Sequence, residues 1–352
     1  MIKDISLLEQ IKENQINKAP DLELITFKPP EYLIQEKGVL YDYDSSKALM
    51  IDNFIETYRR YYGVTGVSAA LVKDGKVVYH KTFGVKNNLT KERVDDSTLF
   101  EAASITKPVF AFAVMRLAER GLIDLDKPLH EYLEFKNVAE DERYKLITAR
   151  IVLSHKTGLG NWMFGGPGGW QNGGKGKLSF KPGEKFGYSG EAYNYLGRVL
   201  EKITGKNLNQ ILQEEVLNPM GMTNTYFSKN EKLTKFAAIG HFHNFPMFYD
   251  IQNSPSPASS MHTEAKDFSK FMIGLMDKKG LSKKTYAEMW KPHTSVPKEE
   301  IIYENGWTQD VSLGFFIENT PHGKLIEHGG NNGDFHSKFS IIPEKNVGFA
   351  MY

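Results

Sequence analysis

Ser104 and Lys107 form the pair of residues with the clearest chemical potential, because they lie three positions apart at the start of an expected helix. Pro108 and the apolar residues 109–117 follow them, which predicts a helix beginning near Thr106. Side chains three residues apart share a helix face, so the amine can reach the hydroxyl. A serine hydroxyl is a weak nucleophile and needs a nearby base, and the N–H groups of a helix start favour an oxyanion. The pair therefore indicates nucleophilic catalysis on a carbonyl group.

The spacing Ser-x-x-Lys is a weak signal when taken alone. It occurs a second time at Ser295 and Lys298, where Pro297 lies between the two residues and no helix is indicated. Ser104 also has a purely structural interpretation as a helix cap, with Lys107 in solvent. The sequence context of Ser104 favours the catalytic interpretation only if other segments contribute groups to the same site.

Two later segments carry groups that could belong to the same catalytic site as Ser104 and Lys107. Tyr188 follows a turn and stands just before an expected helix over residues 193–203. His328, Gly329, Gly330 and Asn331 end an expected strand, where paired glycines let a backbone approach a ligand closely.

Taken in order, these motifs resemble those of the serine β-lactamase and penicillin-binding-protein superfamily. The resemblance is nearest to its class C-like branch, which also holds family VIII esterases, D-aminopeptidases and DD-carboxypeptidases. It covers about residues 45–352. The motifs that carry it are Ser104-Ile-Thr-Lys107, Leu153-Ser-His-Lys-Thr-Gly158, Pro182-Gly-Glu-Lys-Phe-Gly-Tyr188-Ser and His328-Gly-Gly330.

The resemblance implies an acyl-enzyme mechanism without a metal or other cofactor. Ser104 would attack an ester, amide or lactam carbonyl, and a buried Lys107 would accept a proton because burial disfavours its charged form. Tyr188 would act as a proton shuttle or as a base, and the sequence leaves open whether Lys107 or Tyr188 deprotonates the serine. The oxyanion would bind the backbone N–H groups of Ser104 and Asn331.

The remaining residues of the site are expected to bind substrate. His328, where many relatives carry lysine, would contact a substrate carboxylate or polarise Tyr188, with a charge that depends on pH. Gly329 and Gly330, on the same strand, would take part in substrate or oxyanion binding. Trp162 and Trp170 lie in a glycine-rich stretch and would line the acyl pocket, with loop packing as the alternative.

Two departures from the family pattern bear on substrate choice. Gly190 stands where β-lactamases usually carry the asparagine of Tyr-x-Asn, and His328-Gly329 replaces Lys-Thr. These changes favour hydrolysis of small esters or D-amino-acid amides and peptides, with at most weak β-lactamase activity. The alternative is a slowly acylating penicillin- or peptide-binding sensor on the same scaffold.

The elements that must position these groups fit a mixed α/β (α+β) fold. A helix is expected from residue 46 to 62, a β-hairpin over residues 66–83 turning at Asp74-Gly75, and further helices over residues 208–217 and 265–276. Alternating segments at 312–318, 324–328, 338–343 and 347–352 predict strands. Strands at both ends of the chain predict one sheet, and the resemblance implies a central antiparallel sheet flanked by helices, with a helical insertion.

The expected organisation is an N-terminal arm over residues 1–45 and a β-lactamase-like serine hydrolase domain over residues 46–352. In that domain, residues 46–103 and 305–352 would form the sheet part and residues 104–304 the helical part. The family fold usually ends in a long helix, whereas this sequence ends at Tyr352. Either the sequence is truncated, or another element, such as the arm, covers the face of the sheet on which that helix would pack.

Composition excludes several other classes of function. The chain has 352 residues and no cysteine, which excludes disulfides, thiolate metal sites and a thiol nucleophile. A net charge of +1 gives no general attraction for nucleic acid. No segment predicts a transmembrane helix. The expected partner is a small ester, amide or peptide substrate. The sequence leaves the oligomeric state open, and the location is periplasmic or secreted if a signal peptide was removed, and otherwise cytoplasmic.

Overall fold

A hairpin begins the large sheet of the computed structural model, which describes residues 45–163, 174–242, 245–247, 250–298 and 309–352. Strands β1 (Gly66–Lys73) and β2 (Lys76–Gly84) pair in antiparallel fashion. The turn between them is Asp74-Gly75, and both residues have positive φ, at 51° and 73°. This is the conformation that the Asp-Gly pair predicts.

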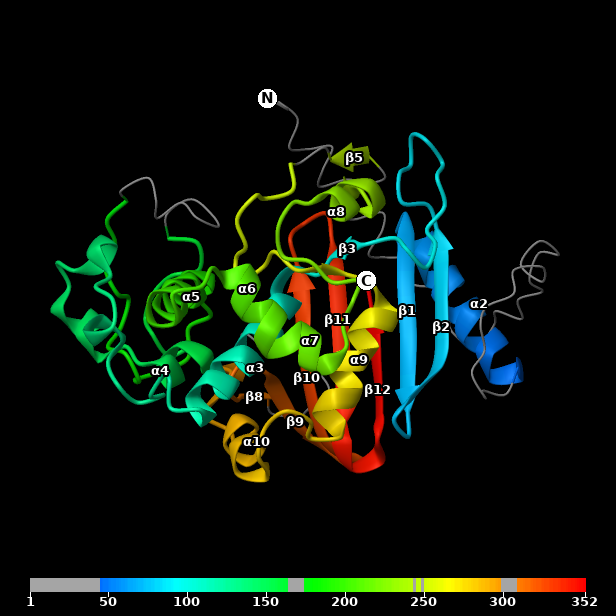
Figure 1. Ribbon diagram of the computed structural model, residues 1–352. Helices are drawn as coiled ribbons and strands as arrows, with labels where there is room; N and C mark the ends of the chain where they lie inside the picture. The colour runs from blue at the N-terminus through cyan, green and yellow to red at the C-terminus, as the bar shows by residue number, and fades with distance from the viewer. Residues whose placement is uncertain (1–44, 164–173, 243–244, 248–249, 299–308) are drawn as a thin grey trace.

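The sheet joins this hairpin to the C-terminal strands. Its order is β2-β1-β12-β11-β10-β9-β8-β7, and every neighbouring pair is antiparallel. Strand β1 lies between β2 and β12, so residues from the two ends of the described chain meet there, with Ala70 opposite Ala350 (Figure 1). The C-terminal strands are β7 (Thr294–Ser295), β8 (Gln309–Val311), β9 (Phe316–Thr320), β10 (Gly323–Asn331), β11 (His336–Ile342) and β12 (Val347–Met351).

Helix α3 (Thr106–Glu119) is the central helix of the core. Its residues from Thr106 to Val114 are all buried, and only Arg116, Ala118 and Glu119 reach solvent at its end. A helix that is apolar all round must be covered on every side. The sheet and the other helices provide this cover, so the first turn of α3 is held rigidly.

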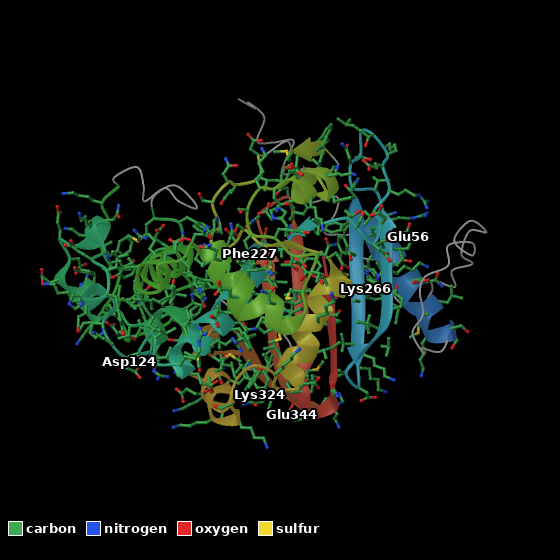
Figure 2. All side chains as sticks on the ribbon, viewed as in Figure 1. Glu56, Asp124, Phe227, Lys266, Lys324 and Glu344 are labelled. Carbon is green, nitrogen blue, oxygen red and sulfur yellow. The ribbon has the colours of Figure 1, made fainter. Side chains whose placement is uncertain are left out.

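Helices cover the sheet on both faces. Helix α9 (Ala265–Met276) packs on β1, β2, β11 and β12, and Figure 1 shows it in front of β11 and β12. Helix α2 (Ser45–Tyr61) lies by the hairpin and joins a separate apolar cluster with Val67, Tyr79 and Phe83. Lys266 and Glu56, labelled in Figure 2, mark α9 and α2. The expected arm is residues 1–45; residues 1–44 lie outside the described residues, and Ser45 is the first residue of α2.

The remaining α-helices lie between Ala149 and Met289 in the chain. They are α4 (Ala149–Leu153), α5 (Gly190–Thr204), α6 (Leu208–Leu212), α7 (Asn218–Met220), α8 (Glu231–Phe236) and α10 (Lys283–Met289). Four short strands form two antiparallel pairs outside the main sheet, β3 (Phe100–Glu101) with β6 (His262–Thr263), and β4 (Gly240–Phe242) with β5 (Phe245–Met247).

Two of the predicted helices differ from expectation in extent. Helix α5 begins at Gly190, three residues before the predicted start, because the Ser189 hydroxyl accepts a hydrogen bond from the Ala192 N–H and caps the first turn. The predicted helix 208–217 is α-helical to Leu212 and continues as a π-helix over Gln213–Leu217. The predicted fold, an antiparallel sheet flanked by helices, is confirmed.

Candidate active site

Ser104 lies in a tight turn that leads directly into α3. This turn is the 3-10 helix η2 (Ala103–Ile105), and Ala103 adopts a left-handed φ of 46°. The Thr106 hydroxyl donates to the Ala103 carbonyl over 2.6 Å and accepts from the Met261 N–H over 3.0 Å. These bonds fix a strained turn, and the first N–H groups of such a turn have no acceptor within it. Ser104 itself is partly exposed.

Lys107 lies beneath Ser104 and is fully buried. Its Nζ atom is 3.1 Å from Ser104 Oγ and 2.9 Å from the Ala258 carbonyl oxygen. Burial lowers the pKa of Lys107 to about 7, because the ammonium form loses its hydration. A large fraction of the molecules therefore carries a neutral amine beside the serine at neutral pH.

Tyr188 lies beside Lys107 and Ser104 and completes this group. The Lys107 Nζ atom lies 4.7 Å from the centre of the Tyr188 ring, and the phenol is hydrogen-bonded to the Ser104 side chain. Burial raises the pKa of Tyr188 above its usual value, and the bond to Ser104 opposes this shift only in part. The phenol is therefore protonated at neutral pH.

His155 holds Tyr188 in position. The two rings stack with their centres 4.2 Å apart, and His155 Nδ1 accepts the Ser189 N–H over 3.2 Å. Burial, together with repulsion from Lys107 and His328, places the pKa of His155 well below 6.5. His155 is thus a neutral support, as an acceptor at Nδ1 requires.

His328 lies on β10 at the far edge of the same group. Its ring centre is 6.4 Å from that of Tyr188 and 5.1 Å from that of Phe316, and 2% of its surface is exposed. Burial and repulsion from Lys107 lower the pKa of His328 to about 3. Nδ1 lies 2.6 Å from the Gly329 carbonyl oxygen, so this nitrogen carries the proton of the neutral ring. The expected pH-dependent charge is therefore absent near neutrality.

Gly330 brings β10 against the turn that holds Ser104. A Cβ atom on Gly330 would lie 2.3 Å from the Ala102 carbonyl oxygen and 2.3 Å from Ser337 Oγ. The Ser337 hydroxyl donates to the same carbonyl over 2.7 Å. Asn331, the next residue, is exposed and pairs with His336 at the end of the strand. The chain at positions 330 and 331 therefore runs beside Ser104, as the predicted oxyanion site needs.

The structure describes two of the three residues expected to line the pocket, Trp162 and Gly190. Gly190 is buried at the start of α5, and a Cβ atom there would lie 2.8 Å from the edge of the Trp162 ring. Trp162 is half-buried and packs against the main core. It has the left-handed φ of 55°. Trp170 lies outside the described residues. Gly329 is partly exposed between His328 and Gly330.

His155 is predicted from its motif to hold a turn near the site and to do no chemistry, and its stacking on Tyr188 agrees with this role. Two other contributors are not predicted. The Ala258 carbonyl that binds Lys107 has no signal in the sequence, because any residue carries that group. Asn161 accepts the Gly190 N–H with its Oδ1 atom over 2.8 Å, and its exposed position gave no pattern to recognise.

The second Ser-x-x-Lys sequence and a His-x-His sequence at residues 241–243 have other contacts where the structure describes them. Ser295 lies on β7, where its hydroxyl donates to Asp310 over 2.6 Å. His241 Nε2 accepts the Asn88 N–H, and His243 lies outside the described residues. In the described part of the chain, no group of three or more His, Cys, Asp or Glu side chains has a metal-binding arrangement. No helix among the described residues is long and apolar enough to span a membrane.

Comparison with known proteins agrees with this geometry. The family model described as Beta-lactamase matches residues 51–352. Protein flp of Staphylococcus aureus (strain MRSA252) is 24% identical over 327 residues, which cover 86% of this chain and 62% of the relative. Esterase EstB of Burkholderia gladioli is 31% identical over 219 residues, covering 56% of this chain and 55% of the esterase. The chain thus spans less than two thirds of the length of these relatives.

Two solved structures share the fold. The octameric penicillin-binding protein homologue from Pyrococcus abyssi has a TM-score of 0.73 at 25% identity, covering 88% of this chain and 73% of that one. The D-alanine carboxypeptidase AmpC from Burkholderia cenocepacia has a TM-score of 0.72 at 19% identity, covering 88% and 94%. At that identity the second likeness shows the fold alone.

Proposed function

The chain belongs to the Beta-lactamase family, and we propose that it is a serine hydrolase that acts through an acyl-Ser104 intermediate. One observation carries the proposal. The amine of Lys107 is buried, has a pKa of about 7 and lies 3.1 Å from Ser104 Oγ. A base with a pKa near the working pH combines a populated neutral form with useful proton affinity. The pair therefore has the distance and the protonation state that nucleophilic attack by serine requires.

We propose that Lys107, and not Tyr188, deprotonates the serine. The phenol of Tyr188 keeps its proton at neutral pH because burial raises its pKa, so it is suited to donate a proton and not to accept one. In the first half-reaction, the Ser104 proton passes to Lys107 as Oγ bonds to the carbonyl carbon. The Tyr188 hydroxyl donates a proton to the leaving oxygen or nitrogen as its bond to carbon breaks, and Lys107 then returns a proton to Tyr188.

The negative charge of the tetrahedral intermediate would be stabilised by the N–H groups of Ser104 and Asn331. Support comes from the close contact of Gly330 with Ala102, which brings the end of β10 beside the turn that holds Ser104. Fixed backbone donors at such a point stabilise an oxyanion without reorganisation. In the second half-reaction, a water molecule attacks the acyl carbon and gives its proton to the neutral amine of Lys107. The bond between the acyl carbon and Ser104 Oγ then breaks, Lys107 returns the proton to Oγ, and the acid product leaves.

The proposed substrates are small esters or D-amino-acid amides and peptides, with at most weak activity on β-lactams. The name of the esterase relative supports the first class. The uncharged state of His328 near pH 7 supplies no positive charge for a substrate carboxylate, which also favours neutral esters. Trp162 beside Gly190 would form one wall of an acyl pocket of limited size.

The test uses the two Ser-x-x-Lys sequences of the chain as a matched pair. Ser104→Ala should abolish hydrolysis of p-nitrophenyl acetate and labelling by a fluorophosphonate probe. Ser295→Ala removes the same hydroxyl from an exposed site paired with Asp310, and it should leave both unchanged. Labelling that persists in Ser104→Ala, or is lost in Ser295→Ala, would overturn the proposal. Turnover of nitrocefin as fast as the best ester would overturn the proposed substrate class.

A further inference from the structure

Glu101 lies on the strand that leads into the turn of Ser104, and its side chain reaches the loop that follows β10. Glu101 ends β3, and Ser104 follows three residues later. The Asn332 side chain donates a hydrogen bond from Nδ2 to Glu101 Oε1. Asn332 directly follows Asn331, whose N–H is a proposed oxyanion donor. One side-chain bond therefore joins the segment of the nucleophile to the segment of that donor.

The backbone around Glu101 is held on both sides. Glu101 pairs with His262 of β6. The next residue, Ala102, donates its N–H to the Met261 carbonyl over 2.7 Å, and its carbonyl accepts the Ser337 hydroxyl over 2.7 Å. The carboxyl group of Glu101 therefore extends from a backbone that is fixed by β6 and β11.

The loop after β10 is closed by its own hydrogen bonds. The Gly333 N–H donates to Asn331 Oδ1 over 2.8 Å. The Asn332 N–H donates to the Phe335 carbonyl over 3.1 Å. Residues 331–333 are all exposed, so side-chain packing does little to hold the loop against the body of the protein. Because its residues are tied to one another, a bond that restrains Asn332 also restrains the neighbouring N–H of Asn331.

The carboxyl group of Glu101 can accept this bond in either protonation state. Burial raises the pKa of Glu101 to about 7, the bond from Asn332 opposes this shift, and Asp334 adds to it. His262 Nε2 lies 4.0 Å from Glu101 Oε2, but burial lowers the pKa of His262 to about 4, so the ring is neutral and forms no ion pair. A carboxylate and a carboxylic acid both offer an oxygen that accepts. Titration of Glu101 therefore leaves the link to Asn332 in place.

We propose that Glu101 is a positioning residue, which holds the Asn331 N–H at the oxyanion site through its bond to Asn332. It acts through Asn332 and not on the substrate. This inference rests on the proposed acyl-Ser104 mechanism and adds a side chain that aligns its oxyanion site. A donor aimed at the oxyanion stabilises the transition state more than the bound ester, so its misplacement lowers kcat and leaves KM nearly unchanged.

The test is a double-mutant cycle on the two partners of the bond. Glu101→Ala and Asn332→Ala each remove it, and we expect kcat for p-nitrophenyl acetate to fall about fivefold in both, the effect of one lost hydrogen bond. KM should change by less than about twofold, since the ground state is unaffected. The double variant should fall no further than either single variant, because both residues act through one bond. Asn332 is exposed, so its variant tests the bond even if Glu101→Ala is less stable.

A conservative variant supplies the rescue. Glu101→Gln keeps an oxygen that accepts from Asn332, so it should retain most of the wild-type kcat, with a pH midpoint that stays near the pKa of Lys107, about 7. A glutamine variant as slow as Glu101→Ala would show that the bond is not what matters, and would overturn the inference.

Inhibition by phenylboronic acid separates positioning from general support of the fold. Ser104 Oγ adds to boron as its proton passes to Lys107, and the tetrahedral adduct resembles the intermediate. We expect the inhibition constant to rise in both alanine variants by the factor by which kcat falls. Unchanged kcat, additive losses in the double variant, or an unchanged inhibition constant would each overturn the inference and leave the mechanism intact. Wild-type protein that hydrolyses no ester and is not labelled at Ser104 would instead contradict the proposed function.

Discussion

Gly330 lies against the Ala102 carbonyl with no room for a side chain between them, since a Cβ atom would approach that oxygen to 2.3 Å. The contact joins the end of β10 to the turn that precedes Ser104. The two segments are far apart in the sequence, and the same carbonyl also accepts a hydrogen bond from Ser337 on β11. The position of the candidate oxyanion site therefore depends on this contact.

Gly330→Ala should push β10 away from Ser104 and lower both stability and kcat. Overpacking of this kind typically costs about 1–3 kcal/mol, and we expect the kcat for p-nitrophenyl acetate to fall at least about tenfold, since oxyanion donors need close placement. Chemical denaturation and steady-state kinetics measure the two effects. Gly329→Ala is the stability control, because its Cβ would have no neighbour nearer than 3.8 Å. Equal stability of the two variants would contradict the account.

The pH dependence of turnover should follow the titration of Lys107. Its pKa is lowered to about 7, so the amine is charged below this pH and neutral above it. If the neutral amine is the base, kcat/KM rises with pH by about tenfold per unit below pH 7 and levels off above it. Lys107→Arg should abolish activity, because a guanidinium stays charged at every accessible pH. A flat or falling profile between pH 5 and 8 would exclude Lys107 as the base.

His155 should affect the rate without affecting this pH dependence. His155→Phe keeps a ring to stack on Tyr188 but loses the acceptor for the Ser189 N–H. His155→Asn keeps an acceptor and tolerates the φ of 54° but loses the ring. Both variants should lower kcat and keep the midpoint near pH 7, since the pKa of His155 lies well below 6.5. If kcat/KM of either variant no longer fell as the pH drops below 7, His155 would have to carry a proton in the reaction.

His328 should behave as a neutral group. Its pKa of about 3 leaves it uncharged in any assay above pH 5. His328→Gln should therefore change the kcat/KM of an uncharged ester only a few-fold, and the midpoint of the pH dependence should stay near pH 7. His328→Lys adds a positive charge near Lys107 and should move the midpoint to lower pH, because like charges disfavour protonation. A midpoint that stays in place in the lysine variant, or moves in the glutamine variant, contradicts this interpretation.

Local signals in the sequence predicted much of the fold. The Asp74-Gly75 turn, the helix from Thr106 and the C-terminal strands follow from turn chemistry and apolar periodicity, which act over a few residues. The strand order does not follow from such signals, because the pairing of Ala70 with Ala350 depends on packing across the whole chain. The left-handed φ of Ala103 is also imposed by its surroundings, since alanine has no preference for it.

The same distinction applies to the candidate site. Ser104, Lys107, Tyr188 and His328 were named from their motifs, and the structure places their side chains in one group. Their protonation states depend on burial, which a motif does not contain. The neutral state of His328 therefore required the structure, whereas the lowered pKa of Lys107 agrees with the burial that the resemblance implied. Asn161 was missed because its contact with Gly190 links two loops that have no common pattern.

Intact-mass spectrometry during turnover of an ester tests the central claim most directly. The account predicts that wild-type protein mixed with p-nitrophenyl acetate gains one acyl group, that proteolysis places it on Ser104, and that the adduct clears as substrate is exhausted. Ser104→Ala should gain no such group. A stable adduct on Ser104 without product release would support the slowly acylating sensor in place of the enzyme. Hydrolysis with no adduct on Ser104, or with equal speed in Ser104→Ala, would contradict the acyl-serine mechanism.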